Sequence, residues 1–527
     1  MRKWGLILLL TALILPGCVY EKADPEQCGG RKYYLSLVLR THGESAATRA
    51  SEGSPNAFED ASLPEMLVAY ADAFFYGADG AYLETRHLTG IDYAAASDPS
   101  VEMQAGTQTV ELSHRPYKML ITANLPDASL LEGKTLSQAK ELASDIACRW
   151  VAPVSVDYNG TPVPDVYPFP MTSSTWLSNS AQVITDVAVP EICLKETAAK
   201  AAAAPFTVYM ERMAAKLTLR MPALEYKLPA VTTVNNISTK VVVLGWGLNA
   251  VNKNAYLFKR VRPSWAADFS WTWYNPSKCR SYWAEDPNYG AGTYPVSAAG
   301  ISGGDALSYV SFNDLSGTLA LDGGGYYSGS LYCRENTADG QYLPLTDGVS
   351  ATLYSRITHV LVKAELQFSL ASGTDTEGYT TAGDIYRYNG VFYASLAAAQ
   401  AAELAYPGSV IECFKDRQLY YKIPVEHLNS VYPLSGTSYN TGNYGVVRNH
   451  RYTITVTGLS GVGTPVADPS EPIVPVRTPG DYQASVYITV SPWQQFQQNF
   501  VFLDPSGALQ TNGQQVESWT DTSGWYE

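Results

Sequence analysis

The chain has 527 residues and a formal net charge of −14, with 36 Lys and Arg residues against 50 Asp and Glu residues. Such an acidic chain lacks the positive surface that a nucleic-acid backbone requires, which excludes DNA and RNA as expected partners. Hydrophobic residues make up 46% of the chain, enough to build large cores, and this argues against general disorder. The 37 Tyr residues and the charged fraction of 16% favour a sheet-forming protein of several domains.

The N-terminus has the layout of an export signal. A positive pair, Arg2-Lys3, precedes an apolar run at residues 4–15 that is too short to span a bilayer. The run ends in Leu15-Pro16-Gly17-Cys18, which resembles the lipobox of bacterial lipoproteins. We therefore predict a signal peptide at residues 1–17 and lipid attachment at Cys18. The alternative is an ordinary signal peptide followed by a cysteine that forms a disulfide.

The first clear strand signal covers residues 33–39. Tyr33, Leu35, Leu37 and Leu39 alternate with other residues and therefore share one face of the predicted strand. The small and polar stretch at residues 41–55 that follows is typical of an exposed linker. The sequence thus predicts a compact strand that an accessible segment joins to the rest of the chain.

Two segments before residue 222 are predicted to form short helices. Residues 135–146 carry Leu and Ala at helical spacing and form the clearest amphipathic helix. The Ala-rich stretch 196–204, which Pro205 ends, is also helical by propensity. After residue 222, repeated short strands separated by turn residues are typical of β-sandwiches. The other apolar segments and strands that we expect cover residues 67–76, 118–125, 209–221, 241–244, 256–258, 359–370, 419–425 and 451–456.

A well-patterned strand lies near the C-terminus, after a Pro-rich arm at residues 463–480. It alternates apolar and polar residues, so that one face is ready for burial. A second apolar segment follows it. A strand on such an arm can fold back onto its own chain or be donated to a neighbouring molecule. The apolar positions are Tyr482, Ala484, Val486, Ile488 and Val490, and in the second segment Trp493 and Phe496.

Motifs for enzymatic chemistry are weak in this sequence. Ser137 and Lys140 match S-x-x-K, a serine nucleophile with a lysine base one helical turn away, but the pattern is common by chance and its partner motifs are missing. No Cys and His cluster has the spacing of a zinc site. We therefore expect no enzyme, no metal and no cofactor. Neighbouring cysteines suggest the disulfides Cys148–Cys193 and Cys279–Cys333 as guesses only.

Several segments follow one another in a recognisable order. Val446-Val447-Arg448-Asn449, with Tyr452 after it, and the strand end Val490-Ser491-Pro492-Trp493 are the clearest. Together they resemble the type V pilin (fimbrillin) family of the Bacteroidales, with the shaft subunit of the short (minor) fimbriae as the closest branch. Further segments of the resemblance, which spans most of the chain, are residues 169–172, 211–219, 419–427 and 458–465.

The resemblance implies an all-β fold with a few short helices and two transthyretin-like β-sandwich domains, at residues 50–222 and 223–480. It implies a fimbrial subunit that reaches the outer membrane as a lipoprotein and polymerises by strand exchange after an Arg-specific protease has cut it. Its partners would be other copies of itself, accessory fimbrial subunits and surface ligands of host or bacterial cells. Its role would be cell adhesion and biofilm formation.

Carried onto this chain, the resemblance makes residues 18–49 a propeptide, with the strand of Tyr33, Leu35, Leu37 and Leu39 as the part removed. The preferred cut lies between Arg49 and Ala50, and Arg40 is the alternative. Residues 481–503 would be the donor strands. The polar tail at residues 504–527 extends past the usual end of the family.

The competing interpretation is a monomeric surface lipoprotein that binds glycans. Aromatic side chains in a Gly- and Ser-rich stretch could provide stacking platforms for sugars. They are Trp265, Trp271, Trp273, Tyr274, Trp283 and Tyr289.

Overall fold

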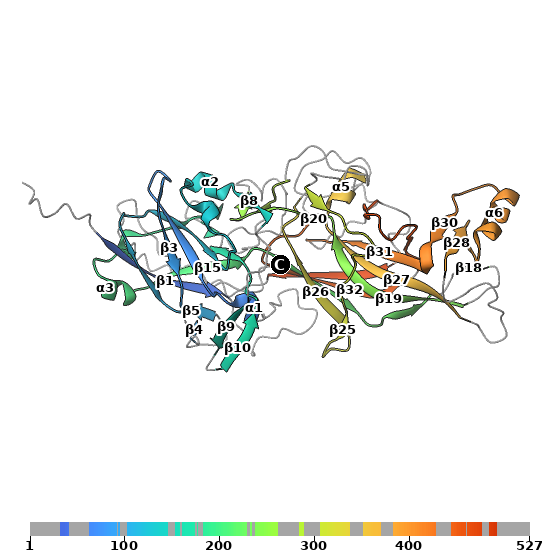
Figure 1. Ribbon diagram of the computed structural model, residues 1–527, viewed down its shortest axis with the longest axis horizontal. Coiled ribbons are helices and arrows are strands. Elements are labelled where there is room, and N and C mark those ends of the chain that lie inside the picture. The colour runs from blue at the N-terminus through green and yellow to red at the C-terminus, as the bar shows by residue number, and fades with distance from the viewer. Residues whose placement is uncertain are drawn as a thin grey trace, which may run out of the picture.

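The computed structural model shows an elongated molecule in which two β-rich domains lie end to end (Figure 1). A mainly β fold with a few short helices was expected, and this fold class is confirmed. No helix within the described ranges is long and apolar enough to cross a membrane. The structure describes residues 32–41, 63–91, 93–94, 103–145, 153–158, 161–173, 176–177, 183–228, 232–233, 238–261, 284–288, 306–337, 351–369, 383–427, 444–459, 461–476 and 484–492.

The first domain is one ten-stranded sheet, ordered β3-β2-β7-β11-β15-β1-β5-β4, with β14 paired to β7 and β6 paired to β1. Arg86 Nε on β3 donates to the Glu111 carbonyl on β6 at 2.7 Å, so distant parts of the sheet approach each other around one core. The strands are β1 (Tyr33–Thr41), β2 (Ala71–Tyr76), β3 (Tyr82–Leu88), β4 (Tyr93–Ala94), β5 (Met103–Ala105), β6 (Gln108–Leu112), β7 (Lys118–Ala123), β11 (Met171–Ser173), β14 (Val187–Ala188) and β15 (Phe206–Arg212).

The second domain is a sandwich of two five-stranded sheets around one large core. One sheet has the order β25 (Ala320–Leu321), β26 (Tyr327–Cys333), β16 (Ala215–Met221), β32 (His450–Leu459), β34 (Ala484–Pro492). The other has the order β17 (Glu225–Lys227), β19 (Ser238–Asn249), β27 (His359–Ser369), β31 (Gln418–Pro424), β33 (Thr464–Pro465).

Smaller sheets complete the fold. A four-stranded sheet at the far end of the second domain has the order β18 (Thr232–Thr233), β29 (Val391–Tyr393), β28 (Ile385–Tyr388), β30 (Glu412–Phe414), and helix α6 (Leu396–Ala405) lies beside it (Figure 1). The two-stranded pairs are β9 (Val154–Tyr158) with β10 (Thr161–Val166), β12 (Trp176–Leu177) with β13 (Val183–Ile184), β20 (Val251–Asn252) with β24 (Leu307–Ser308), β8 (Ala143–Ser144) with β21 (Ala255–Tyr256), and β22 (Arg260–Val261) with β23 (Ala284–Glu285).

The chain passes from one domain to the other between Arg212 and Ala215. β15 belongs to the first sheet, and β16 already pairs with β26 and β32 of the second domain. The segment 209–221, expected as one strand, therefore consists of two strands in different domains. Met213 and Ala214 between them are buried. This change of sheet comes before residue 222, the expected end of the first domain.

The helices are shorter than the sequence predicts. The helix expected at residues 135–146 is only α2 (Leu136–Lys140), which begins with a capping box between Thr135 and Gln138. Within the same segment, Ala143 and Ser144 form β8 because they pair with β21, a contact that helical propensity cannot anticipate. The remaining α-helices are α1 (Leu63–Met66), α3 (Ala198–Ala202), which falls inside the expected stretch 196–204, and α5 (Ala351–Arg356).

Candidate functional site

Strand β1 lies inside the first sheet rather than at its edge. Residues Leu37 to Arg40 pair in parallel with Phe206 to Tyr209 of β15. On its other side, β1 pairs antiparallel with β6 and, near its end, with β5. In the described part of the sheet, β15 is therefore joined to β5 and β6 only through the backbone hydrogen bonds of β1. Without it, these strands would face each other across an open groove lined by unpaired backbone groups.

Both faces of β1 are buried. Leu35, Leu37 and Leu39 have no more than 1% of their surface exposed and belong to the core of the first domain. Ser36 and Val38 on the opposite face are also almost fully buried. The alternation identified the first face from the sequence but not the second. Tyr33, the fourth residue of the predicted face, is partly exposed and packs against the same core.

The two candidate cleavage sites differ in their setting. The backbone of Arg40 is paired on both sides, with Tyr209 of β15 and Gln104 of β5. Arg49 and Ala50 lie outside the described residues, as do Cys18 and the whole signal segment. A protease binds its substrate in extended, unpaired form, so a cut at Arg40 would first require part of β1 to leave the sheet.

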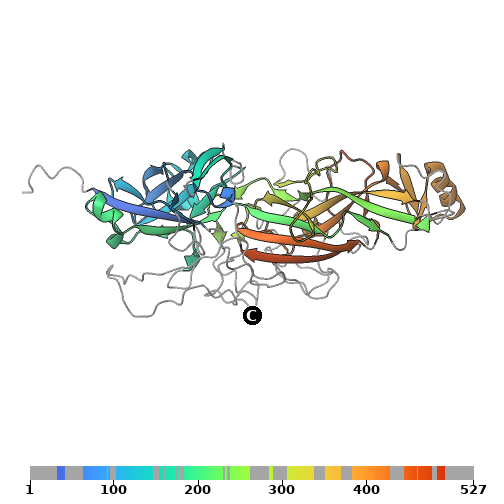
Figure 2. The ribbon, with the colours of Figure 1, turned by 90° about the horizontal axis from the view of Figure 1, so that it is seen from below.

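The C-terminal strand β34 folds back onto its own chain. It pairs antiparallel with β32 along its whole length, from Ala484 opposite Leu459 to Pro492 opposite His450. Among the described strands it forms the edge of its sheet, and Figure 2 shows it in red beside β32. The side chain of Ile488 is partly buried and packs against the core of the second domain. Of the expected donor positions, Ala484, Val486, Ile488 and Val490 lie in β34, and Tyr482, Trp493 and Phe496 lie outside the described residues.

The Val446-Val447-Arg448-Asn449 motif lies at the junction of the two domains. Arg448 Nη2 donates to Glu335 Oε2 at 2.7 Å, and both side chains are fully buried. Arg448 Nη1 donates to the Leu257 carbonyl at 2.9 Å, next to β21, which pairs with β8 of the first domain. Asn449 has a φ of 61°, and its amide oxygen accepts from the backbone N–H of Arg212 at 3.3 Å. The motif thus connects the second domain to the end of β15.

A second buried group joins α1 to the second domain. Glu65 accepts from Lys216 Nζ at 2.9 Å and from the Tyr332 hydroxyl at 2.6 Å, and its carbonyl accepts from Arg212. Burial opposes the ionised form of Glu65, but the charge of Lys216 and the Tyr332 hydrogen bond hold its pKa below the ordinary value. Burial lowers the pKa of Arg212 to about 10. Sequence patterns gave no signal for this group, because its members are far apart in the chain.

Two buried histidines belong to the same junction. The rings of His427 and His450 have centroids 5.4 Å apart, and His427 Nδ1 is 2.8 Å from the Tyr452 hydroxyl. Burial lowers the pKa of both rings, that of His450 to about 3, and the nearby Lys259 adds to the effect. Both rings are therefore neutral near pH 7. Within the described ranges, no three His, Cys, Asp or Glu residues are placed to hold a metal ion.

The S-x-x-K pair does not have the arrangement of a nucleophile and its base. Lys140 Nζ donates to Asp186 Oδ1 at 2.6 Å, so its ammonium group is engaged in an ion pair with that carboxylate. The aromatic residues of the glycan interpretation lie outside the described residues, from Trp265 to Tyr289. Cys193 is a free thiol, which contradicts its suggested disulfide with Cys148. Cys279, the suggested partner of Cys333, lies outside the described residues, so that pairing stays a guess.

Comparison with known proteins gives one family match. Residues 412–499 match the family described as major fimbrial subunit protein type IV, fimbrillin, C-terminal. The match begins at β30 and continues past the end of β34. This part of the chain is therefore similar to the C-terminal part of fimbrial subunits. No curated protein matches the sequence.

Solved structures show weak similarity over most of the chain. A candidate cell adhesion protein from Parabacteroides distasonis is 14% identical, with a TM-score of 0.39, over 88% of this chain and 100% of that one. A fimbrilin from Porphyromonas gingivalis is 13% identical, with a TM-score of 0.35, over 88% and 99%. The tip fimbrial protein Mfa3 from the same organism is 11% identical, with a TM-score of 0.34, over 87% and 100%. Similarities this low carry no argument about function.

Proposed function

We propose that the protein is a subunit of a surface fimbrium. In this proposal it is exported as a lipoprotein on Cys18, cut after Arg49 and polymerised by strand exchange. β1 leaves the first domain, and the C-terminal strand of another copy fills the vacated groove. The fibre serves cell adhesion, and the partners of the subunit are further copies and accessory subunits. The family match at residues 412–499 supports the fimbrial part of the proposal.

The observation that carries the mechanism is the position of β1. It is the first described element, it is paired on both edges, and its three leucines fill one core. Burying them contributes roughly 1.5–3 kcal/mol each, or about 5–9 kcal/mol together. A small domain is stable by only about 5–15 kcal/mol. A first domain that has lost β1 therefore needs a replacement strand.

β34 has the dimensions of such a replacement. It is nine residues long, as β1 is. Val486, Ile488 and Val490 have the same spacing as Leu35, Leu37 and Leu39, so three apolar side chains of a donated strand can occupy the three leucine sites. As an edge strand within the described part of the sheet, β34 is held by backbone hydrogen bonds on one side only and can leave without breaking a second ladder.

The setting of the two arginines favours the cut at Arg49. Arg40 lies in a paired strand, whereas the sequence around Arg49 is small and polar and is expected to be accessible. A cut after Arg49 severs the link between β1 and α1 without touching either element.

The N-terminal residue of the mature surface protein tests this proposal. Edman sequencing of the protein sheared from intact cells is expected to start at Ala50. A start at Thr41 would move the cut to Arg40 and leave the exchange mechanism in place. A blocked, lipid-bearing Cys18 on all of the surface protein would refute the processing step.

A further inference from the structure

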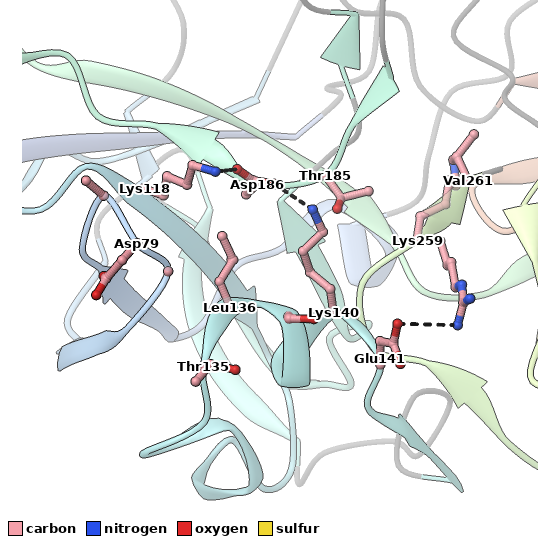
Figure 3. A pocket seen from close by; sticks show the side chains of 14 residues that line it. Asp79, Lys118, Thr135, Leu136, Lys140, Glu141, Thr185, Asp186, Lys259 and Val261 are labelled. Carbon is pink, nitrogen blue, oxygen red and sulfur yellow. Dashed lines mark hydrogen bonds and ion pairs between the residues drawn. The ribbon is translucent and has the colours of Figure 1, made fainter. Parts of the chain in front are cut away.

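A cavity of about 630 Å³ lies beside α2, and no residue of β1 or β34 lines it. Its lining comes from the turn between β2 and β3, the start of β7, α2, the residues before β14 and the segment of the second domain that contains β22. Ser137 and Lys140, the S-x-x-K pair of the sequence, both line it. Figure 3 shows Lys140 between Asp186 and Lys259.

Two lysines of this cavity share one carboxylate. Lys140 Nζ is 2.6 Å from Asp186 Oδ1, and Lys118 Nζ is 3.4 Å from Asp186 Oδ2. Asp186 is 8% exposed, and both lysine side chains are more than a third exposed. Burial opposes ionisation of Asp186, but the hydrogen bond and charge of Lys140 and the charge of Lys118 hold its pKa below the ordinary value. With both lysines charged, this group has one positive charge in excess.

The other basic residues of the cavity are matched by carboxylates. Lys259 Nζ lies 2.9 Å from Glu211 Oε2, with both side chains 2% exposed. Arg260 Nε lies 2.9 Å from Glu285 Oε2, and its Nη1 lies 3.9 Å from Glu141 Oε1. Asp79 accepts a hydrogen bond from the backbone of its own turn. Among the described residues, the positive excess is therefore confined to the Lys118 and Lys140 side.

Hydroxyl, carboxylate and apolar groups complete the lining. Thr135, Ser137 and Thr185 bring hydroxyls to it, and Asp79 and Glu141 bring acceptor oxygens. Cavities of about 300–1,000 Å³ hold small molecules, and most of them are largely apolar. The hydroxyls, the acceptor oxygens and the pair of ammonium groups in this lining suit a ligand with several hydroxyls and one acidic group.

We propose that this cavity binds an acidic monosaccharide, with its carboxylate bridging Lys118 and Lys140 and its hydroxyls bonded to the hydroxyl and carboxylate side chains opposite. Each ammonium group has three donors, so both can bind a ligand oxygen while keeping their contact with Asp186. The site is separate from the strand exchange and does not depend on the proposed fimbrial function.

Titration of the purified full chain with glucuronic acid, followed by saturation-transfer NMR and calorimetry, tests the proposal. Glucose is the uncharged probe. The double variant K118Q/K140Q should bind glucuronic acid about tenfold more weakly or not at all, because both charge contacts are lost. K200Q, which changes an exposed lysine of α3 outside the cavity, should bind as the wild type does.

The variant D186N gives a result of opposite sign. It removes the carboxylate that competes for the two ammonium groups, so glucuronic acid should bind more tightly than to the wild type. Circular dichroism checks that each variant is folded. If D186N does not fold, the binding of glucuronic acid to K118Q/K140Q tests the proposal by itself. Equal binding of glucose and glucuronic acid, no binding of glucuronic acid to the wild type, or unchanged binding by K118Q/K140Q would overturn the proposal.

Discussion

Shortening Leu37 of β1 to alanine should weaken the precursor and leave the fibre unchanged. Leu37 has no exposed surface and lies in the core of the first domain. Replacing a fully buried Leu by Ala costs about 2–5 kcal/mol, because the transfer free energy is lost and a cavity remains. The free energy of unfolding of the L37A precursor should fall by that amount. In the proposed fibre β1 has been removed together with residue 37, so the substitution should not change the stability of the fibre.

Ile121 of β7 provides the matched control. It is equally buried and lies in the same core, but its strand stays in the subunit before and after the cut. Ile121→Ala should therefore destabilise both forms. Precursor stability is measured by urea unfolding with Trp fluorescence, and fibre stability by the temperature at which the oligomer ladder collapses on SDS gels. If L37A lowers that temperature as much as I121A does, β1 remains in the polymer and the exchange mechanism is wrong.

Three further predictions follow from the same arrangement. Truncation after Gly480 should leave a folded, exported monomer, because the donor strand is missing and the first domain keeps β1; normal fibres in electron micrographs would exclude β34 as the donor. Arg49→Ala, alone or with Arg40→Ala, should block polymerisation, and unchanged fibre length in the double variant would contradict the processing step. Because burial lowers the pKa values of His427 and His450 in the folded state, stability should be full above pH 6.5 and decline as the pH falls toward 5. The loss should be about 2 kcal/mol for His450, with a further loss from His427. Urea unfolding that is the same at pH 7.5 and pH 5 would show that the rings are not held neutral.

The sequence predicted the strands well where one apolar face decides the pattern. Three predicted strands agree with the structure to within a few residues. They are β1, predicted at residues 33–39, β27, predicted at 359–370, and β34, predicted at 482–490. Alternation does not say which sheet a strand joins, and residues 209–221 show this clearly. Two buried residues, Met213 and Ala214, carry the chain from one core to the other without interrupting the apolar pattern.

The site was predictable only in part, for a related reason. The Arg448 motif was visible as a resemblance, but its role depends on Glu335 and Arg212, which lie more than a hundred residues away. The prediction of a helix at residues 135–146 was wrong for the same reason, because β8 within this segment pairs with a strand of the other domain. Local spacing contains no information about such contacts, which only the folded chain brings together.

In the proposed mechanism, the domain junction holds the subunit together when β1 is lost. The buried pairs Glu65 with Lys216 and Arg448 with Glu335 involve no residue of β1. Glu65 and Lys216 lie in different domains, and because removing one partner of a buried ion pair costs about 3–5 kcal/mol, this pair opposes separation of the two domains. α1 is the first described element after the proposed cut, and Glu65 attaches it directly to the second domain. In the proposed mechanism the cut therefore opens a groove in one sheet, and the junction keeps that groove at a fixed position relative to the second domain, which donates β34.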